Sequence, residues 1–290
     1  MPDTPQQPAN IPFFKMLYLL FFNPKVFEVL AHKGVLRSFV HILLVSLVSS
    51  IVIAASYSTQ VLESGKKWET FVNRDVGTFG FDDEDKLFWD KPSENPFTIH
   101  IDDWRVDFDS MPLDEDLARR GSAKKGIWIT RDGITGWDWI EIEPLFKPRE
   151  EIFRMRTLEQ MFPYLVKHGP KKVDGPEEVA LFVEQVCMEI ISQIGVRSFF
   201  SMFFVFGLLS FTFSILYLFS LGNRDPRFRR SLPRLLVVYL HTCIPPIIVG
   251  TIYESLHVPA MSFFTVFCIA FFVYHMYVMR HFRRESLLTE

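Results

Sequence analysis

Three histidines, His41, His241 and His275, could support chemistry because they lie inside long apolar segments. Each is four to seven residues from the nearest flanking arginine, which places all three roughly 6–11 Å inside one edge of an apolar layer. Three imidazoles at one depth could bind a metal ion or relay protons. We favour the alternative that each reaches water or a hydroxyl such as that of Tyr239 or Tyr274. Because these segments contain no Asp or Glu, we predict no metal site and no cofactor.

Two adjacent prolines, Pro245 and Pro246, lie in the middle of another apolar stretch. Each removes a backbone donor, so we expect a kink or a break in a helix at this point. Such a feature could serve as a hinge or as part of a small-ligand site between helices. The alternative, which we favour, is that it only shapes the packing of the helices.

Three tryptophans, Trp128, Trp137 and Trp139, surround the turn Asp132-Gly133, which lies between two alternating apolar runs and indicates a β-hairpin. They could form an aromatic platform for a ligand or a partner. They could equally pack in a core, since an isolated hairpin needs such packing, and we favour this second interpretation.

Four apolar stretches of about 20 residues must position these groups. Each is long enough to cross a hydrocarbon layer about 30 Å thick, and none contains Lys, Arg, Asp or Glu. They are Ser38–Tyr57, Phe199–Leu221, Leu235–Tyr253 and Pro259–Met279. The sequence therefore predicts an α-helical membrane protein with four transmembrane helices.

Charge sets the expected orientation. Residues 58–196 hold 28 acidic and 18 basic residues, a balance of −10, and the rest of the chain has a balance of +7, which gives the net charge of −3. Lys and Arg in short loops favour the cytoplasmic side. We therefore expect both termini in the cytoplasm. Arg227, Arg229 and Arg230 then lie in a basic cytoplasmic loop, where they could contact lipid headgroups. Retention of the loop in the cytoplasm is a sufficient reason for them, and we favour it, although the two are compatible.

The expected fold is thus a four-helix membrane protein with an extracytoplasmic α+β domain inserted between helices 1 and 2. Strand-like alternation and a final helix capped by Asp174 support the mixed class of that domain. The segments are a cytoplasmic tail with an interfacial amphipathic helix (1–37), the first transmembrane helix (38–57), the extracytoplasmic domain (58–196), the second transmembrane helix (197–221), the basic cytoplasmic loop (222–234), the third (235–253) and fourth (259–279) transmembrane helices, and a cytoplasmic tail (280–290).

The chain resembles a known family in three places. These are Phe14–Tyr18 with Asn23–Phe27 near the start, the hairpin Gly126–Ile134, and Leu240–Ile248 with its proline pair. It is similar to a bacterial multi-pass membrane protein family without an assigned function, sometimes labelled maltodextrin-utilisation protein. Its N-terminal element also resembles the Yip1-like membrane proteins. The resemblance implies no catalytic residues and at most a link to sugar uptake.

No motif in the sequence indicates a reaction: a phosphate-binding glycine loop, HExxH, CxxC pairs and GxSxG are all absent. We therefore expect a non-enzymatic binding, sensing or accessory protein of a bacterial cytoplasmic membrane. Its expected partners are the lipid bilayer and another membrane protein or further copies of itself. Nucleic acid is not expected, because the basic residues lie next to the membrane. The alternative is a component of a membrane transporter, with substrate passing near the prolines and histidines.

Overall fold

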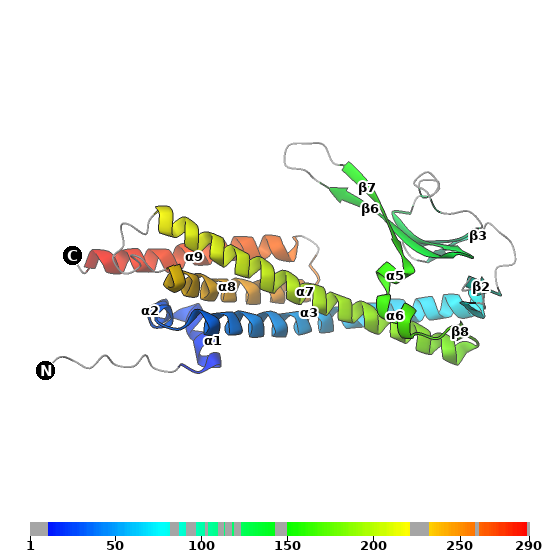
Figure 1. Ribbon diagram of the computed structural model, residues 1–290, viewed down its shortest axis with the longest axis horizontal. Helices are drawn as coiled ribbons and strands as arrows, with labels where there is room; N and C mark the ends of the chain where they lie inside the picture. The colour runs from blue at the N-terminus through cyan, green and yellow to red at the C-terminus, as the bar shows by residue number, and fades with distance from the viewer. Residues whose placement is uncertain are drawn as a thin grey trace. The chain divides into compact units, whose positions relative to one another are not determined.

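The computed structural model describes residues 11–81, 87–90, 97–101, 104–109, 113, 118, 123–142, 150–220, 232–258 and 261–288. This described part of the chain is mainly helical, with four long apolar helices and two β-sheets (Figure 1). It divides into residues 1–57 with 193–290, here called unit 1, and residues 58–192, called unit 2. Each unit is described by itself.

Four helices are long and apolar enough to cross a membrane, as the sequence predicts. They are α3 (Val35–Phe71), α7 (Pro176–Ser220), α8 (Leu232–Ser255) and α9 (Phe263–Leu288). Both α3 and α7 contribute residues to both units. Helix α7 is a single helix of 45 residues, so the helix that begins at Pro176 continues without interruption into the second apolar stretch.

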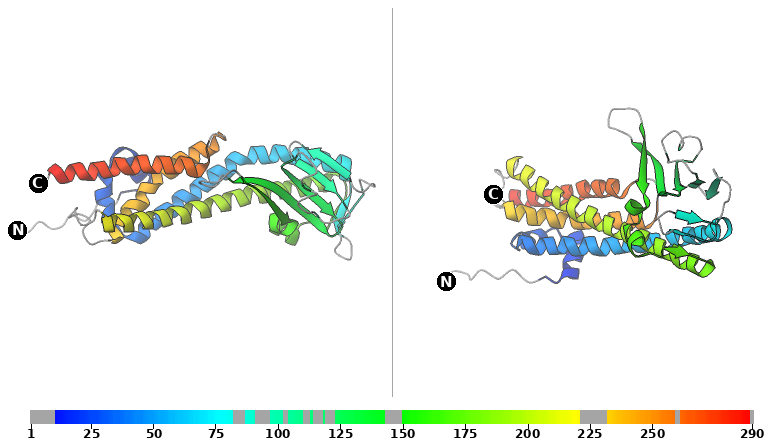
Figure 2. Two further views of the ribbon diagram at one scale, coloured as in Figure 1. Left: turned by 90° about the horizontal axis from the view of Figure 1, so that it is seen from above. Right: turned by 45° about the vertical axis from the view of Figure 1, so that its right-hand side comes forward.

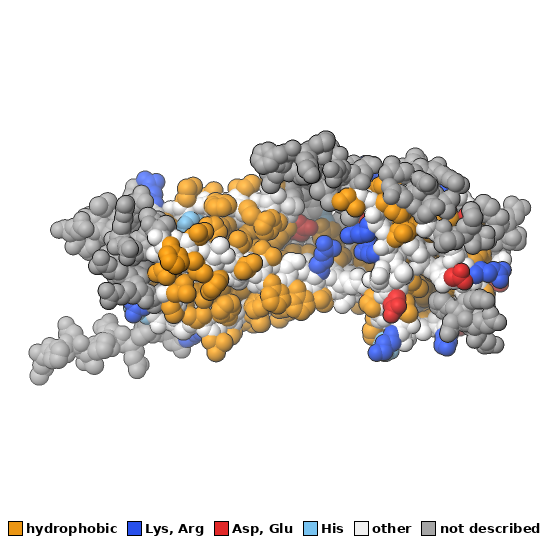
Figure 3. Space-filling view, turned by 45° about the horizontal axis from the view of Figure 1, so that its top comes forward, with side chains coloured by type: hydrophobic (Ala, Val, Ile, Leu, Met, Phe, Trp, Pro, Cys, Tyr) orange, Lys and Arg blue, Asp and Glu red, His pale blue; other side chains and the backbone are white. Residues whose placement is uncertain are grey.

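The helices of unit 1 pack through small and apolar side chains. Gly195 of α7 leaves room for Ala54 of α3, to which an added Cβ would come within 3.4 Å. Small residues at such crossings allow close approach of helices in membranes. Helix α8 is buried along most of its length. Apolar side chains of α3, α7 and α9 point outward instead, and Figure 3 shows hydrophobic side chains gathered over these helices.

Two short helices precede α3, with Pro24 between them, which cannot donate a backbone hydrogen bond to the preceding turn. Helix α1 (Phe13–Phe22) ends at Asn23, and α2 (Val26–Ala31) follows. Met16 and Leu20 of α1 are fully buried in the core of unit 1, whereas Phe14, Tyr18 and Phe22 are exposed. Helix α1 therefore has an apolar face on the bundle and a second apolar face outside it, and it lies crosswise to α3 (Figure 1).

Unit 2 contains two sheets (Figure 2). The smaller has the order β2-β1-β8, with β1 (Phe79–Phe81), β2 (Leu87–Trp89) and β8 (Lys172–Val173). The larger has the order β3-β4-β5-β6-β7. Its strands are β3 (Phe97–Ile101), β4 (Trp104–Phe108), β5 (Lys125–Thr130), β6 (Gly133–Ile142) and β7 (Glu150–Thr157). All neighbours in the larger sheet are antiparallel except β4 and β5, which are parallel.

Residues of unit 2 that favour turns and helix ends in the sequence lie at turns and at a helix end in the structure. Helix α3 passes into a π-helical turn, η1 (Val72–Val76), and stops at Gly77, whose φ of 70° suits glycine. The predicted hairpin is confirmed, because β5 and β6 pair antiparallel around Asp132-Gly133. Expected features within residues 82–86, 102–103 and 110–122 lie wholly or mostly outside the described residues.

Two local predictions need correction. The single helix expected over residues 157–167 is divided into α5 (Leu158–Met161) and α6 (Pro163–His168), because Pro163 cannot continue the hydrogen-bond ladder of α5. Asp174 does not act as the expected N-cap, since Gly175 directly precedes α7. The Asp174 carboxylate instead accepts hydrogen bonds from Thr78 and Lys172, which joins β8 to the start of β1.

Candidate functional site

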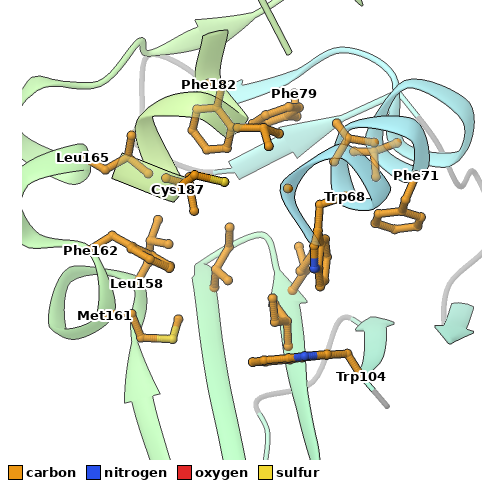
Figure 4. Close-up of a pocket in the computed structure, with 18 of the residues that line it drawn as sticks. Trp68, Phe71, Phe79, Trp104, Leu158, Met161, Phe162, Leu165, Phe182 and Cys187 are labelled. Carbon is orange, nitrogen blue, oxygen red and sulfur yellow. The ribbon is translucent and has the colours of Figure 1, made fainter. Parts of the chain in front are cut away.

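Unit 2 contains an apolar cavity of about 450 Å³ that is partly open to its surroundings. Helices α3 and α7 form one wall, the larger sheet forms the opposite wall, and α5 and α6 contribute to a side (Figure 4). Most ligand sites of proteins are concave, mainly apolar and of about 300–1,000 Å³. The cavity is therefore the candidate functional site of the described chain.

The helical wall is built from one face of each helix. On α3, Val61, Trp68 and Phe71 recur at helical spacing, so that their side chains share the face toward the cavity. The helices approach closely where Gly65 faces Cys187 of α7. A Cβ added at Gly65 would come within 2.5 Å of the Cys187 Sγ, so only glycine fits this contact without a shift.

The sheet wall follows from strand alternation. Successive side chains of a strand point to opposite faces, so Ile127 and Ile129 of β5 face the cavity and Trp128 faces away. Trp104 and Phe108 of the parallel neighbour β4 continue the same apolar face. The cavity thus lies between a helix pair and one face of a mixed sheet.

Helices α5 and α6 are held in place by hydrogen bonds to their first turns. Thr157 and Gln160 form a capping box at the start of α5. The Glu189 carboxylate of α7 accepts from the backbone N–H groups of Tyr164 and Leu165 at 2.9 and 3.0 Å. These N–H groups have no partner within α6, so the buried Glu189 carboxylate anchors the helix and its cavity-lining Leu165 to α7.

The polarity of the lining changes at its edge. Among the described residues that line the cavity, none is charged, and the polar side chains are Gln60 and Ser64, one helical turn apart on α3. Both are exposed, whereas the other lining residues are buried or half-buried. Gln60 and Ser64 therefore mark the mouth of the cavity, and the interior offers mainly dispersion and hydrophobic contacts, with the Cys187 thiol and the indole N–H groups of its tryptophans as polar atoms.

The Asp174 carboxyl is a titratable group at the edge of the smaller sheet. The Lys172 ammonium, 3.1 Å from its Oδ2, and the Thr78 hydroxyl stabilise the ionised form, so they lower the pKa of Asp174 below its ordinary value of 3.8. The group is fully exposed, and its effect on the cavity is confined to fixing the strand edge.

The tryptophans proposed as a platform lie on the face of the larger sheet that is opposite to the cavity. Trp128 and Trp137 are buried there with Ala118, and Trp139 packs on Phe153 with ring centroids 4.9 Å apart. The structure thus brings the three together on one face, as alternation predicts for Trp137 and Trp139. Their burial favours the core interpretation. Trp68, Trp89 and Trp104 line the cavity instead.

Two of the three histidines meet inside unit 1. The Nδ1 of His241 lies 2.8 Å from the Val237 carbonyl oxygen, which can only accept, so this nitrogen carries the proton. Its Nε2 then accepts from the Nδ1 of His41 at 3.0 Å. His275 is placed differently, with its ring stacked on that of Tyr239 at 5.3 Å. The structure therefore pairs His41 with His241 and gives His275 an aromatic neighbour.

The remaining predicted positions are simple to place. Pro245 and Pro246 are buried within α8, which continues as one helix from Leu232 to Ser255, so the helix is not broken there and the kink stays a prediction. Arg227, Arg229 and Arg230 lie outside the described residues. Within the part of the chain that the structure describes, no group of three or more His, Cys, Asp or Glu side chains could hold a metal ion.

The cavity could have been anticipated only in part from the sequence. The helical spacing of Val61, Trp68 and Phe71 and the alternation of Trp104 and Phe108 each indicate an apolar face. Nothing in the local pattern shows that these two faces oppose each other, because α3 and β4 are separate segments and their packing depends on the fold of the whole unit.

The chain is similar to a known protein family over part of its length. A family model described as "Protein of unknown function (DUF1189)" matches residues 14–140. No curated protein and no solved structure matches the chain. The resemblance seen in the sequence is thus supported as far as a family of unknown function. Bacterial origin, the maltodextrin label and the Yip1-like features stay predictions.

Proposed function

We propose that the protein is a non-enzymatic integral membrane protein whose unit 2 binds an apolar ligand, in a sensing or accessory role. The single observation that carries the proposal is the cavity of about 450 Å³, whose described interior lining has no charged side chain. A site of this composition can bind but has no nucleophile–base pair or acid–base pair for catalysis.

We further propose that the four apolar helices cross a bacterial cytoplasmic membrane, with both termini in the cytoplasm and unit 2 on the outer side. The basic residues that flank the apolar segments support this orientation: Lys15, Lys25, Lys33, Arg37, Arg234 and Arg280. Tags inserted near Glu94 and after Glu290 should be reached by a membrane-impermeant reagent from opposite sides. Labelling of both tags on intact cells would contradict the orientation.

Binding can be tested with the full-length protein in lipid nanodiscs. All six tryptophans of the chain lie in residues 58–192, so energy transfer from tryptophan to an uncharged, environment-sensitive dye reports on unit 2. We expect saturable transfer in the wild type. The substitution Val186→Phe places a larger side chain in the lining and should abolish it.

The matched control is Leu181→Phe on the same helix, at an exposed position outside the lining. It adds a comparable ring without reaching the cavity and should bind the dye like the wild type. Equal binding by Val186→Phe and Leu181→Phe would show that the dye enters the lipid and not the cavity, and the proposal would then be wrong.

A membrane-protein partner or a second copy of the chain would complete an accessory role. The support is compositional: exposed apolar side chains lie along α3 and α7, which suits lipid as well as neighbouring helices. Purification in a mild detergent, followed by mass measurement of the intact assembly, distinguishes a monomer, an oligomer and a complex.

A second candidate function, a component of a membrane transporter, is favoured by one observation. His41 and His241 form a hydrogen-bonded pair buried in unit 1, and ionisable groups among membrane helices often belong to a substrate or proton path. Replacement of His241 by Asn should then change solute accumulation in vesicles, while Val186→Phe should not. The reverse pattern supports the binding function.

A further inference from the structure

The lining of the cavity restricts the chemistry of its ligand. A buried hydroxyl or amide without a partner costs about 2–7 kcal/mol, and an ion costs more. Because the described interior lining offers no charged group, a sugar or a free ion would lose its water without compensation. The body of the ligand must therefore be apolar.

The shape of the lining restricts the ligand further. On α3 it extends from Gln60 to Phe71, twelve residues that span about 16 Å of helix. Along that length the opposite wall is a sheet with large side chains such as Trp104 and Phe108. A cavity of about 450 Å³ that extends along this length can accommodate a linear apolar chain.

The mouth of the cavity offers side chains that can bind the polar end of a ligand. Gln60 and Ser64 are exposed and share one face of α3, so an amide and a hydroxyl can hydrogen-bond the same polar group. Exposed Lys67 follows Ser64 by three residues and adds positive charge on that side of the helix. Gln60 comes only three residues after Tyr57, where the first apolar segment ends.

We propose that the cavity binds one acyl chain of a single-chain amphiphile, a fatty acid or a lysophospholipid, with its polar end at Gln60 and Ser64. The inference rests on the proposed binding function of unit 2 and names the class of ligand for that site. The acyl chain fills the apolar interior, and the head remains at the hydrated mouth.

The distribution of tryptophans provides a direct readout. Trp68, Trp89 and Trp104 line the cavity, and Trp128, Trp137 and Trp139 lie on the opposite face of the larger sheet. Bromine on an acyl chain quenches tryptophan emission only at short range. An occupied cavity should therefore lose the emission of the first group and keep that of the second.

The test uses the full-length protein in nanodiscs of unbrominated lipid. It is titrated with a brominated fatty acid, with a brominated lysophosphatidylcholine and, as a control, with a brominated diacyl lipid. We expect saturable quenching by either or both single-chain probes, and their relative strength identifies the source of the chain. The double variant Trp68→Phe/Trp104→Phe should lose most of the quenching, and Trp139→Phe should retain it.

Two filling variants make the result specific for the cavity. Val186→Phe on α7 and Ile129→Phe on β5 change opposite walls, and both should abolish the saturable quenching, with Leu181→Phe as the unaffected control. Circular dichroism and the emission maximum show which variant is folded, and one folded filling variant is enough. Quenching that rises linearly with probe, or persists in a folded filling variant, would overturn the inference.

The experiment distinguishes a failure of the acyl-chain inference from a failure of the proposed binding function. If the uncharged dye binds to the wild type and no single-chain probe displaces it, the acyl-chain inference is wrong and the binding function stands. If neither the dye nor the probes bind saturably, both are wrong. Displacement of the dye by unlabelled fatty acid or lysophospholipid, at one chain per protein, supports both.

Discussion

The two faces of the larger sheet in unit 2 use aromatic residues in different ways. On one face, Trp128 and Trp137 are buried in a closed cluster. On the other, Trp104 and Phe108 border a cavity. Aromatic side chains of the same sheet therefore form a packed cluster on one face and line a cavity on the other. The difference arises from what covers each face and not from the residue types.

Glycines on neighbouring strands give the strongest test of this comparison. A Cβ at Gly126 of β5 would overlap the Arg105 carbonyl oxygen and approach the Trp137 ring to 2.7 Å, on the closed face. A Cβ at Gly136 of β6 would overlap only the Sδ of Met161, on the cavity face. Backbone cannot move aside, whereas a methionine side chain can shift into free volume.

We therefore expect Gly126→Ala to destabilise unit 2 by about 3 kcal/mol and Gly136→Ala by under about 1 kcal/mol. Thermal unfolding followed by tryptophan fluorescence measures both, because all six tryptophans lie in this unit. Equal losses for the two variants would mean that the two faces are equally closed, and the comparison would fail.

A smaller effect is expected in the helical wall. Gly65→Ala adds a Cβ 2.5 Å from the Cys187 Sγ, and the two helices must separate or the thiol must rotate. We expect a loss of about 1–2 kcal/mol. The double variant Gly65→Ala/Cys187→Ala removes the overlap and should regain most of the loss, as a double-mutant cycle of unfolding free energies would show. Additive losses of unfolding free energy would mean that the contact between residues 65 and 187 is not the cause of the effect.

The smallest effect concerns the edge of the smaller sheet. The pKa of Asp174 is lowered in the folded protein, so its contribution to stability is present above the ordinary value of 3.8 and is lost as the pH falls through the lowered folded value. Asp174→Asn removes this contribution. Melting temperatures of wild type and variant should therefore differ slightly at pH 6 and converge in strong acid. A difference that does not vary with pH would exclude a charge effect.

The sequence predicts well those features that depend on neighbouring residues. Gly77 ends the extension of α3, Asp132-Gly133 forms the hairpin, and the long apolar segments lie in the four long helices. Each depends on backbone freedom or on a run of apolar side chains, and both can be read locally.

Features that depend on distant residues could not be predicted in this way. His41 and His241 are 200 residues apart, and their hydrogen bond follows from the packing of α3 and α8. Alternation places Trp128 opposite Ile127 and Ile129, but it cannot show which face is closed. That depends on the helices α3, α5 and α7, which come from separate parts of the chain.

One contact in unit 1 bears on the order in which the protein is assembled. The Tyr274 hydroxyl of α9 donates a hydrogen bond to the Leu20 carbonyl in the last turn of α1, across 254 residues of sequence. Carbonyls in the last turn of a helix lack partners within it. Because synthesis proceeds from the N-terminus, the Leu20 carbonyl can receive this partner only after α9 has been made, whereas the buried side chains of α1 can already pack against α8.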